Sequence, residues 1–343
     1  MNKVGFYGGK FLPLHQGHVY AIIKASTMVD ELYVVLSHSE KRDRELCKES
    51  KFPYIPSRIR LRWLSQLTKD MKNVKVIEVE DHDGDEDYNW KEGSIKIKEA
   101  IGKNIDVVFS SEIGYDPIFQ ELYPEATHVL IDGKRKQVPI SATEIRKKGV
   151  FQYWHYIPEV AKPYFVKKVV ILGTESCGKS TLTRNLAIMY NTTYVSEYGR
   201  EICEELGGCD GIMLDEDYPL IAYGHKLKEY EASKQANKIV FIDTEAAVTQ
   251  FYSELYNRKT QQVLEEIAKL QNYDLCLFLE PDVKWVDDGL RVHGEQQVRE
   301  ENNQRLKQLL NEYGIPFVSV NGSYQERLDK AIELIRERVG VTN

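Results

Sequence analysis

The stretch KVVILGTESCGKST at residues 168–181 decides the fold of the second half of the chain. Its first six residues are mostly apolar and β-branched, which predicts a buried strand. The following GTESCGKST has the spacing G-x-x-x-x-G-K-[ST], in which successive backbone N–H groups surround phosphate oxygens. A helix is expected from about 179 to 190. Strand, glycine loop and helix in this order predict a nucleoside triphosphate site on a parallel α/β sheet.

Each residue of this loop has an expected role. Lys179 is expected to reach the β- and γ-phosphate oxygens as a catalytic residue, and Ser180 to bind Mg²⁺. For Cys177, a small buried filler is favoured over an oxidation-sensitive thiol. The residues expected to contact ATP are Gly173, Glu175, Ser176, Cys177, Gly178, Lys179, Ser180 and Thr181.

Carboxylates follow two later strands of the same half. IVFIDT at 239–244 ends an apolar strand with Asp243, which we expect beside the phosphate loop as a second Mg²⁺ ligand. The alternative is that Asp243 caps the next helix. SEYGRE places Glu197 and Arg200 after another strand, as substrate-binding residues or, for Glu197, as a surface ion pair. Either Asp243 or Glu197 could be the catalytic base.

The segment WVDDGLRVHGE at 285–295 resembles the arginine-bearing lid of small-molecule kinases. Lids exclude water and stabilise the charge of the transferred phosphoryl group. Arg291 is therefore expected to bind ATP, and Trp285 and Asp288 to contact substrate. For Trp285, simple packing is the alternative.

The first half opens in the same way, with a strand at 3–8 followed by GKFLPLHQGH at 9–18. His15 and His18 are three apart at the start of a helix, so they share a face near its free N–H groups. With Lys10 they predict a polyphosphate site of positive potential. Metal binding by the two histidines is the alternative, although no third ligand is near in sequence.

The stretch ISATEIR at 140–146 predicts a second turn into a helix. Ser141 and Thr143 can cap that helix or contact phosphate, and Arg146 can bind phosphate with its guanidinium fork. Together, GKFLPLHQGH and ISATEIR resemble the two signatures of the HxGH nucleotidyltransferase superfamily. The resemblance implies adenylyl transfer from ATP, with Lys10, His15, His18 and Arg146 as catalytic donors. It also implies ATP contacts at Gly9, Phe11, Ser141 and Thr143.

The acidic segment EDHDGDEDYNW at 80–90 allows two interpretations. Its charge favours a solvated loop. Trp90, beside Asn89, can instead stack on a flat cationic ring such as nicotinamide, and a comparable tryptophan occurs in adenylyltransferases acting on nicotinamide mononucleotide. We expect both residues to bind substrate. The basic residues Arg58, Arg60 and Arg62 of the helix at 56–71 are expected to form a solvated face.

Composition limits the class of protein. The 343 residues contain 46 Lys and Arg against 53 Asp and Glu, a net charge of −7 that disfavours a nucleic-acid-binding protein. No apolar run approaches the length of a membrane span, and no signal peptide is present. The five cysteines, Cys47, Cys177, Cys203, Cys209 and Cys276, form no disulfide or zinc pattern. These features predict a reduced, cytoplasmic protein.

Strands alternate with helices in both halves, which predicts two α/β domains with doubly wound parallel sheets. The aromatic stretch FQYWHYIPEVAKPYFVKK at 151–168 interrupts this alternation. We therefore expect a nucleotidyltransferase domain of Rossmann-like fold at 1–163 and a P-loop kinase domain at 164–343.

The order of these motifs along the whole chain resembles the bifunctional NadR family. The resemblance implies a ribosylnicotinamide kinase in the second half and a nicotinamide-nucleotide adenylyltransferase in the first. Nicotinamide riboside, nicotinamide mononucleotide, NAD and ATP would be its ligands, with Mg²⁺ as cofactor. Two alternatives are an adenylyltransferase and kinase of coenzyme A synthesis, and a non-catalytic sensor of NAD or ATP.

Some NadR proteins carry an N-terminal helix-turn-helix and repress transcription. Here Met1 leads directly into the first strand, which predicts the form without that module and without DNA binding. No membrane insertion is expected. The resemblance leaves open a functional link to a riboside transporter and assembly as a homo-oligomer.

Overall fold

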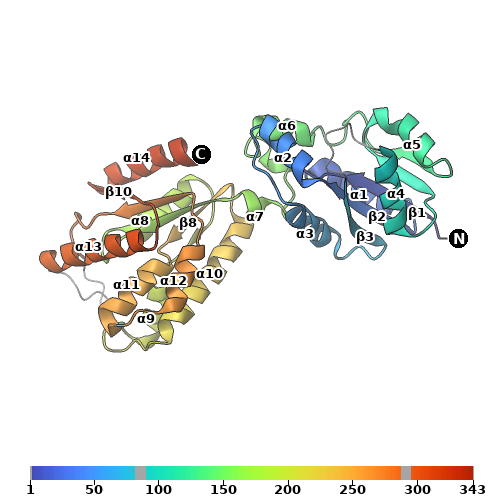
Figure 1. The fold of residues 1–343 in the computed structure, drawn as a ribbon. Helices are drawn as coiled ribbons and strands as arrows, with labels where there is room; N and C mark the ends of the chain where they lie inside the picture. The colour runs from blue at the N-terminus through green and yellow to red at the C-terminus, as the bar shows by residue number, and fades with distance from the viewer. Residues whose placement is uncertain (1, 82–89, 287–294, 343) are drawn as a thin grey trace. The chain divides into compact units, whose positions relative to one another are not determined.

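The computed structural model describes residues 2–81, 90–286 and 295–342. The chain divides into two compact units, Met1–Lys162 and Pro163–Asn343. Each unit contains one five-stranded parallel sheet with helices around it (Figure 1). The expected fold class of two α/β domains with parallel sheets is confirmed. None of the described helices combines the length and apolar composition needed to cross a bilayer.

The sheet of the first unit has the strand order β3-β2-β1-β4-β5. Its strands are β1 Val4–Gly9, β2 Glu31–His38, β3 Val74–Glu80, β4 Val107–Ser110 and β5 Thr127–Leu130. Its helices are α1 Gln16–Ser26, α2 Glu40–Glu49, α3 Ser57–Thr68, α4 Trp90–Ile101, α5 Asp116–Leu122 and α6 Ala142–Lys148, with short 3₁₀ turns η1 Ile113–Tyr115 and η2 Trp154–Tyr156. The chain moves outward from β1 to β3 and then crosses to β4, so the order reverses between β1 and β4. In open α/β sheets ligands bind at this point, beyond the carboxyl ends of the strands.

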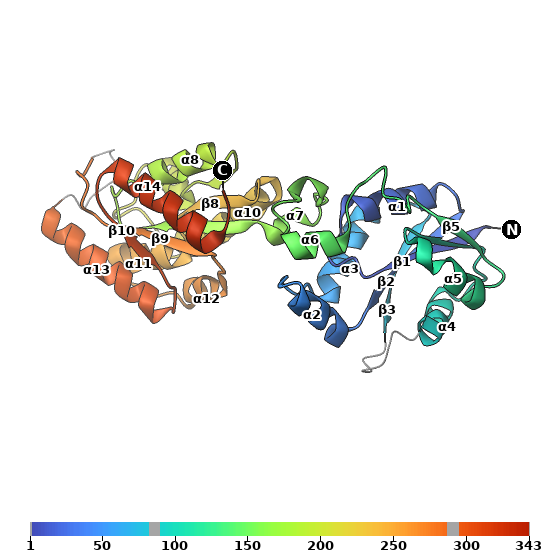
Figure 2. The same ribbon diagram turned by 90° about the horizontal axis from the view of Figure 1, so that it is seen from above.

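Side chains of the central strand β1 point alternately to the two faces of the sheet, and helices cover both faces. Val4 and Phe6 of β1 lie on one face and pack in one core with Ile97 of α4 and Tyr123, which follows α5. Figure 2 shows α4 and α5 beside each other, and the two helices are in contact. α1 and α3 contact β2 with buried apolar residues such as Ile22.

The sheet of the second unit has the strand order β10-β9-β6-β8-β7. Its strands are β6 Lys167–Leu172, β7 Tyr194–Val195, β8 Ile239–Asp243, β9 Leu275–Leu279 and β10 Val318–Val320. Its helices are α7 Lys162–Phe165, α8 Lys179–Met189, α9 Tyr198–Leu206, α10 Asp217–Gln235, α11 Ala246–Asn257, α12 Gln262–Leu270, α13 Gln296–Glu312 and α14 Tyr324–Leu334, followed by one π-helical turn, η3 Ile335–Val339. Helices α8 and α14 lie on one side of the sheet, and α10, α11 and α12 on the other (Figure 1).

Some elements are short, irregular or were not expected from the sequence. α2 Glu40–Glu49 was not predicted, because its sequence is almost entirely polar and only Asp43 and Cys47 are buried. The edge strand β7 has two residues, since it pairs with β8 alone. The last helix ends as an α-helix at Leu334 and continues as the π turn.

Candidate active sites

A cavity of about 510 Å³ lies at the carboxyl ends of β1 and β4, where the strand order of the first sheet reverses. The expected site residues that line it are Gly9, Lys10, Phe11, His15, His18, Trp90, Ser141, Thr143 and Arg146. Two signatures far apart in the sequence therefore meet at one site. Asn89 lies outside the described residues.

His15 and His18 form a mutual cap at the start of α1. Nδ1 of His15 accepts a hydrogen bond from the Gly17 N–H at 3.1 Å, and Nδ1 of His18 accepts one from the His15 N–H at 3.3 Å. A Cβ at Gly17 would lie 2.9 Å from the His15 ring, so this cap requires glycine between the histidines. The described residues offer no third side chain that would complete a metal site here.

The two histidines are neutral. Burial, with the charge of Arg135, lowers the pKa of His15 to about 3. Burial also holds the pKa of His18 well below its usual range, aided by His15 and Arg135. Because each Nδ1 is an acceptor, the ring proton is on Nε2, which is left to donate. The pair therefore supplies neutral donors, and the expectation that it contributes positive potential is wrong.

A buried ion network holds Lys10 at the cavity. Nζ of Lys10 lies 2.7 Å from Oδ1 of Asp43, and Nη2 of Arg60 lies 2.7 Å from Oδ2 of the same carboxylate. Arg60 also donates to the Lys10 carbonyl at 2.8 Å. Arg60 and Asp43 are fully buried, so the expectation that Arg60 belongs to a solvated face is wrong. Its place on α3 three residues before the buried Trp63 was the available sequence signal.

Arg146 of α6 and Ser141, which precedes α6, line the same cavity. Nη1 of Arg146 donates to the Leu12 carbonyl at 2.7 Å, and Nη2 donates to Thr143 Oγ1 at 3.1 Å. Nε of Arg146 is buried and has no partner in the described part of the chain. Ser141 accepts from the Glu144 N–H at 3.1 Å and caps α6. Of the two expected roles for Ser141, the capping role is observed.

Aromatic side chains form the other end of the same cavity. The ring of Trp90 lies edge-on to Tyr115, with centroids 4.9 Å apart, and near Phe119 at 6.1 Å. All three line the cavity, as does Arg135, which donates to the Ile140 carbonyl and pairs with Glu112. The lining residues thus include two groups. The polar side chains of Lys10, His15, His18 and Arg146, here called the polar end, suit phosphate, and the rings of Trp90, Tyr115 and Phe119, here called the aromatic end, suit a flat ring.

A second cavity, of about 140 Å³, lies at the phosphate loop of the second unit. The expected residues that line it are Glu175, Ser176, Cys177, Gly178, Lys179, Ser180, Thr181, Glu197 and Arg200. Gly173 has φ +142°, and a Cβ there would lie 2.7 Å from the Leu279 carbonyl oxygen, so the loop requires this glycine. Trp285 is not among the lining residues, although the neighbouring Val286 N–H donates to Ser176 Oγ at 2.8 Å. Asp288 and Arg291 lie outside the described residues.

The loop lysine is buried and held in place by the loop itself. Nζ of Lys179 donates to the Thr174 carbonyl at 2.9 Å. Burial alone would lower the pKa of Lys179, but Cys177 and the carboxylates of Glu197 and Asp243 raise it above its ordinary value. Cys177 is buried as a filler, and its Sγ donates to the Thr174 carbonyl.

Asp243 ends β8 beside Ser180, and its side chain is buried. Burial and the nearby Glu197 raise the pKa of Asp243 to about 7, while Lys179 and a hydrogen bond with Ser180 oppose that rise. Its Oδ1 has no hydrogen-bond partner among the described residues. Glu245, not Asp243, caps α11, accepting from the Ala247 N–H at 2.8 Å, so the capping alternative for Asp243 is wrong.

The oxygen donors of Ser180 and Asp243 fit Mg²⁺. A hydroxyl and a buried carboxylate with an open oxygen are the donor types that Mg²⁺ prefers, and phosphate and water oxygens usually complete its shell. Residues 2–81, 90–286 and 295–342 contain no cluster of three or more His, Cys, Asp or Glu that could hold a metal without a nucleotide.

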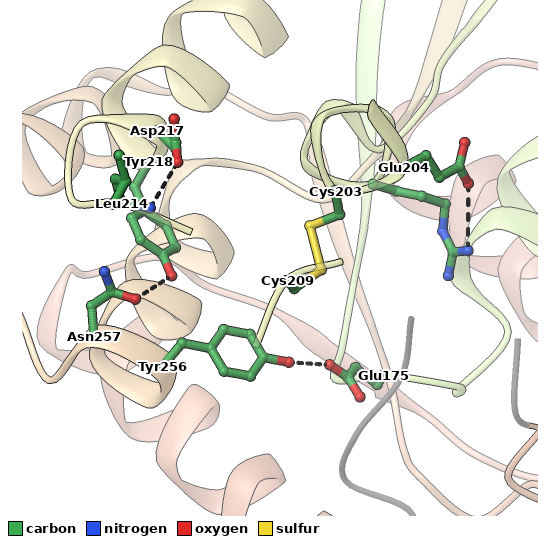
Figure 3. Close-up of a disulfide and its surroundings, with 10 residues drawn as sticks. Glu175, Cys203, Glu204, Cys209, Leu214, Asp217, Tyr218, Tyr256 and Asn257 are labelled. Carbon is green, nitrogen blue, oxygen red and sulfur yellow. Dashed lines mark hydrogen bonds and ion pairs between the residues drawn. A yellow bond between two sulfur atoms is a disulfide. The ribbon is translucent and has the colours of Figure 1, made fainter. Parts of the chain in front are cut away.

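Cys203 and Cys209 are joined in a disulfide, with Cα atoms 5.2 Å apart (Figure 3). The expectation of five reduced cysteines is therefore wrong for this pair. Cys203 lies near the end of α9, and Gly207 and Gly208 with positive φ turn the chain back so that Cys209 meets it. Both cysteines line the second cavity.

Three tyrosines of this cavity were missed by the sequence analysis. Tyr252 and Tyr256 of α11 have stacked rings with centroids 5.8 Å apart, and the Tyr256 hydroxyl donates to Glu175 at 2.7 Å. The Tyr218 hydroxyl donates to Oδ1 of Asn257 at 2.9 Å (Figure 3). The spacing of four residues between Tyr252 and Tyr256 was a signal, but it is equally typical of core packing.

Comparison with known proteins identifies the family. Residues 6–148 match the Cytidylyltransferase-like family, and residues 168–327 match the AAA domain family. The Trifunctional NAD biosynthesis/regulator protein NadR of Escherichia coli (strain K12) is 38% identical over 347 residues, covering 98% of this chain and 83% of that protein. The chain belongs to the NadR family.

Solved structures of NadR proteins agree with this membership. A crystal structure of NadR protein in complex with NR matches with a TM-score of 0.80 and 27% identity, covering 100% of this chain and 97% of that one. Another, in complex with NAD and AMP-PNP, matches with a TM-score of 0.79 and 27% identity, covering 100% and 98%. The two cavities of this NadR-family chain are thus set in a whole-chain fold shared with ligand-bound relatives.

Proposed function

We propose that this NadR-family chain makes NAD from nicotinamide riboside in two ATP-dependent steps. A kinase domain at 164–343 phosphorylates the riboside to nicotinamide mononucleotide. A nucleotidyltransferase domain at 1–163 then transfers AMP from ATP to the mononucleotide and releases pyrophosphate. The observation that carries this proposal is the presence of two separate phosphate-type cavities, one in each unit, in a family whose solved members were bound to NR and to NAD with AMP-PNP.

In the kinase step, the backbone of the phosphate loop and Lys179 bind the triphosphate of ATP. Ser180 and Asp243 hold Mg²⁺, which supplies positive charge to the phosphate oxygens. Glu197 lines the cavity whereas Asp243 is assigned to Mg²⁺, so we assign Glu197 to accept the proton of the riboside hydroxyl. Arg200 lines the same cavity and binds substrate.

Three expected kinase residues remain predictions. Trp285 is assigned to substrate although it does not line the cavity, and Asp288 and Arg291 lie outside the described residues. The tyrosine rings of α11 offer an aromatic surface for the pyridinium ring of the riboside.

In the adenylyl transfer, a phosphate oxygen of the mononucleotide attacks the α-phosphorus of ATP, and the bond to the pyrophosphate oxygen breaks. No covalent enzyme intermediate is formed. Nε2–H of His15 and of His18 donate to phosphate oxygens, while Lys10 and Arg146 offset the charge that develops there. Because the histidines are neutral, the positive charge that stabilises the reacting phosphates comes from Lys10 and Arg146.

The remaining contacts of this site divide between its two ends. ATP is held at Gly9, Phe11, Ser141 and Thr143, which line the polar end. The nicotinamide ring is placed against Trp90 at the aromatic end. Asn89 keeps its predicted role as a substrate contact.

Further aspects of the proposal rest on composition. We place the enzyme in the cytoplasm, where ATP is available. The net charge of −7 argues against DNA binding. A functional link to a riboside transporter and a homo-oligomer are compatible with this proposal but are not required by it.

Product analysis with nicotinamide riboside, ATP and Mg²⁺ tests the two-step assignment. The wild-type chain is expected to yield mononucleotide and then NAD. Lys179→Ala should leave the riboside unchanged yet still convert added mononucleotide. His18→Ala should accumulate mononucleotide. If each variant loses both steps equally, the assignment of one step to each unit is wrong.

Two control experiments separate the alternatives. Dephospho-coenzyme A with ATP should give no phosphorylated product, whereas efficient turnover would support the coenzyme A interpretation. Tight binding of NAD or ATP without turnover of either nicotinamide substrate would support the sensor interpretation.

A further inference from the structure

We propose that Asp43 is a positioning residue for adenylyl transfer, which it serves by fixing the ammonium group of Lys10 at the edge of the first cavity. Arg60 holds Asp43 in turn. This inference rests on the proposed function, because it assigns the pair to the adenylyl-transfer step.

The carboxylate of Asp43 is shared between two cations. Asp43 lies in the first turn of α2, and its side chain reaches back to Lys10 in the loop that follows β1. Its Oδ1 lies 2.7 Å from Lys10 Nζ, and its Oδ2 lies 2.7 Å from Arg60 Nη2. The Asp43 side chain has no exposed surface, whereas 35% of the Lys10 side chain is exposed. The contact therefore joins a buried anchor to the partly exposed side chain of Lys10, a residue that lines the cavity.

Arg60 closes this arrangement from a third segment. Its Nη1 donates to the backbone carbonyl of Lys10 at 2.8 Å, so one guanidinium fixes both the carboxylate and the main chain of Lys10. The Arg60 side chain is also fully buried. The loop after β1, α2 and α3 are thereby connected through charged hydrogen bonds, which are short and directional.

The chemistry explains why such an anchor would matter. A lysine ammonium is carried on a flexible four-carbon stem, and placing it at a developing charge costs rotamer freedom. A cation already held in position needs no rearrangement when the charge on phosphate changes. A purely structural ion pair would only have needed to join α2 to α3, and Lys10, which lines the cavity, would not have been part of it.

The test uses the full chain, because its kinase activity reports folding and concentration in the same sample. Asp43→Asn keeps the shape of the side chain and removes its charge. We expect kcat for adenylyl transfer to fall about 10- to 100-fold, somewhat less than the effect of deleting a direct donor. KM for nicotinamide mononucleotide should change less than about threefold, and the kinase rate should be unchanged, since the substitution alters only the placement of Lys10.

A double-mutant comparison separates positioning from stability. Lys10→Ala with Asp43→Asn should be no slower than Lys10→Ala alone, within about twofold, because the anchor has no effect without the lysine. A matched control is Asp106→Ala, which removes the side-chain acceptor for the Val4 N–H at the amino ends of the strands. That control should lower the melting temperature without lowering kcat.

The contrary outcomes are distinct. If the effects of Lys10→Ala and Asp43→Asn multiply, or if Asp43→Asn has wild-type kcat, the inference is wrong. If Asp43→Asn fails to fold, Arg60→Lys is the variant to measure. Lysine keeps the positive charge but cannot bind both the Asp43 carboxylate and the Lys10 carbonyl. Unchanged kcat in that variant would overturn the inference. A wild-type chain that makes no NAD from mononucleotide would instead contradict the proposed function.

Discussion

The rings of His15 and His18 are stacked with their centroids 3.7 Å apart, and the two side chains cap the same helix end. Each ring accepts a backbone N–H at Nδ1, and burial keeps both uncharged. Two like charges at this distance would repel strongly in a buried site. The stacked pair is thus arranged for neutral imidazoles that donate through Nε2.

The first prediction follows from this neutral state. The imidazole resonances of His15 and His18 should not titrate between pH 5 and 8 in the folded protein, as checked by NMR with His15→Gln and His18→Gln used for assignment. Titration of either ring near pH 6.5 would contradict the neutral pair. The unfolded chain binds these protons at pH 6.5 and below, while the folded chain does not. Stability should therefore fall as the pH falls below about 6.5, by about 1.4 kcal/mol per pH unit for each histidine.

The second prediction concerns Ser180 and Asp243, the expected Mg²⁺ ligands of the second unit. Asp243→Asn should reduce kcat of the kinase about 100-fold or more and raise the Mg²⁺ concentration needed for half-maximal rate about tenfold, because a charged metal ligand is lost. Ser180→Ala should have a smaller effect in the same direction. Adenylyl transfer by both variants is the internal control and should be unchanged. An unaltered Mg²⁺ requirement in Asp243→Asn would show that the ion is held elsewhere.

The third prediction concerns the aromatic end of the first cavity. Trp90→Ala should raise KM for nicotinamide mononucleotide about 5- to 30-fold, which is the range expected for losing a cation–π contact with the pyridinium ring. Trp90→Phe should recover part of this loss, and KM for ATP should change little. Steady-state kinetics of adenylyl transfer measure both constants. Equal increases in KM for ATP and mononucleotide would indicate a general distortion of the cavity instead.

The fourth prediction concerns the disulfide at the second cavity. Reduction, or Cys203→Ser with Cys209→Ser, should lower the stability of the second unit by about 2 kcal/mol, the loop-closure value for so short a loop. Because both cysteines line the cavity, KM for nicotinamide riboside should rise severalfold. Mass spectrometry with and without a dithiol establishes the bond. The double variant is the control, because the dithiol should have no effect on it. An unchanged KM after reduction would show that the disulfide does not contribute to substrate binding.

Much of both sites could be predicted from local sequence. The phosphate loop at 173–181 and the histidine turn at 9–18 are sets of residues whose backbone requirements can be read from their own spacing. Gly173 and Gly17 are needed because a Cβ would collide with nearby atoms, and neighbouring residues already indicate the turn. The carboxyl-edge position of Asp243 likewise follows from an apolar strand that ends in an acid.

The properties that depend on packing could not be predicted in this way. Arg60 is a basic residue in a basic segment, and its burial against Asp43 depends on α2, an element whose polar sequence gives no periodic signal. The meeting of Cys203 with Cys209 depends on a glycine turn, and the lining of the second cavity by tyrosines depends on how α10 and α11 pack beside the phosphate loop.

Strand and helix periodicity and glycine turns are local properties of the chain, so they predict the two α/β domains, the two phosphate-type loops and the chemical types of the residues in them. The uncharged state of the histidines, the anchoring of Lys10 through Asp43 to Arg60, and the disulfide beside the second cavity are visible only in the folded chain. Charge state and ion pairing depend on desolvation and on partners from distant segments, which meet only when the chain has folded.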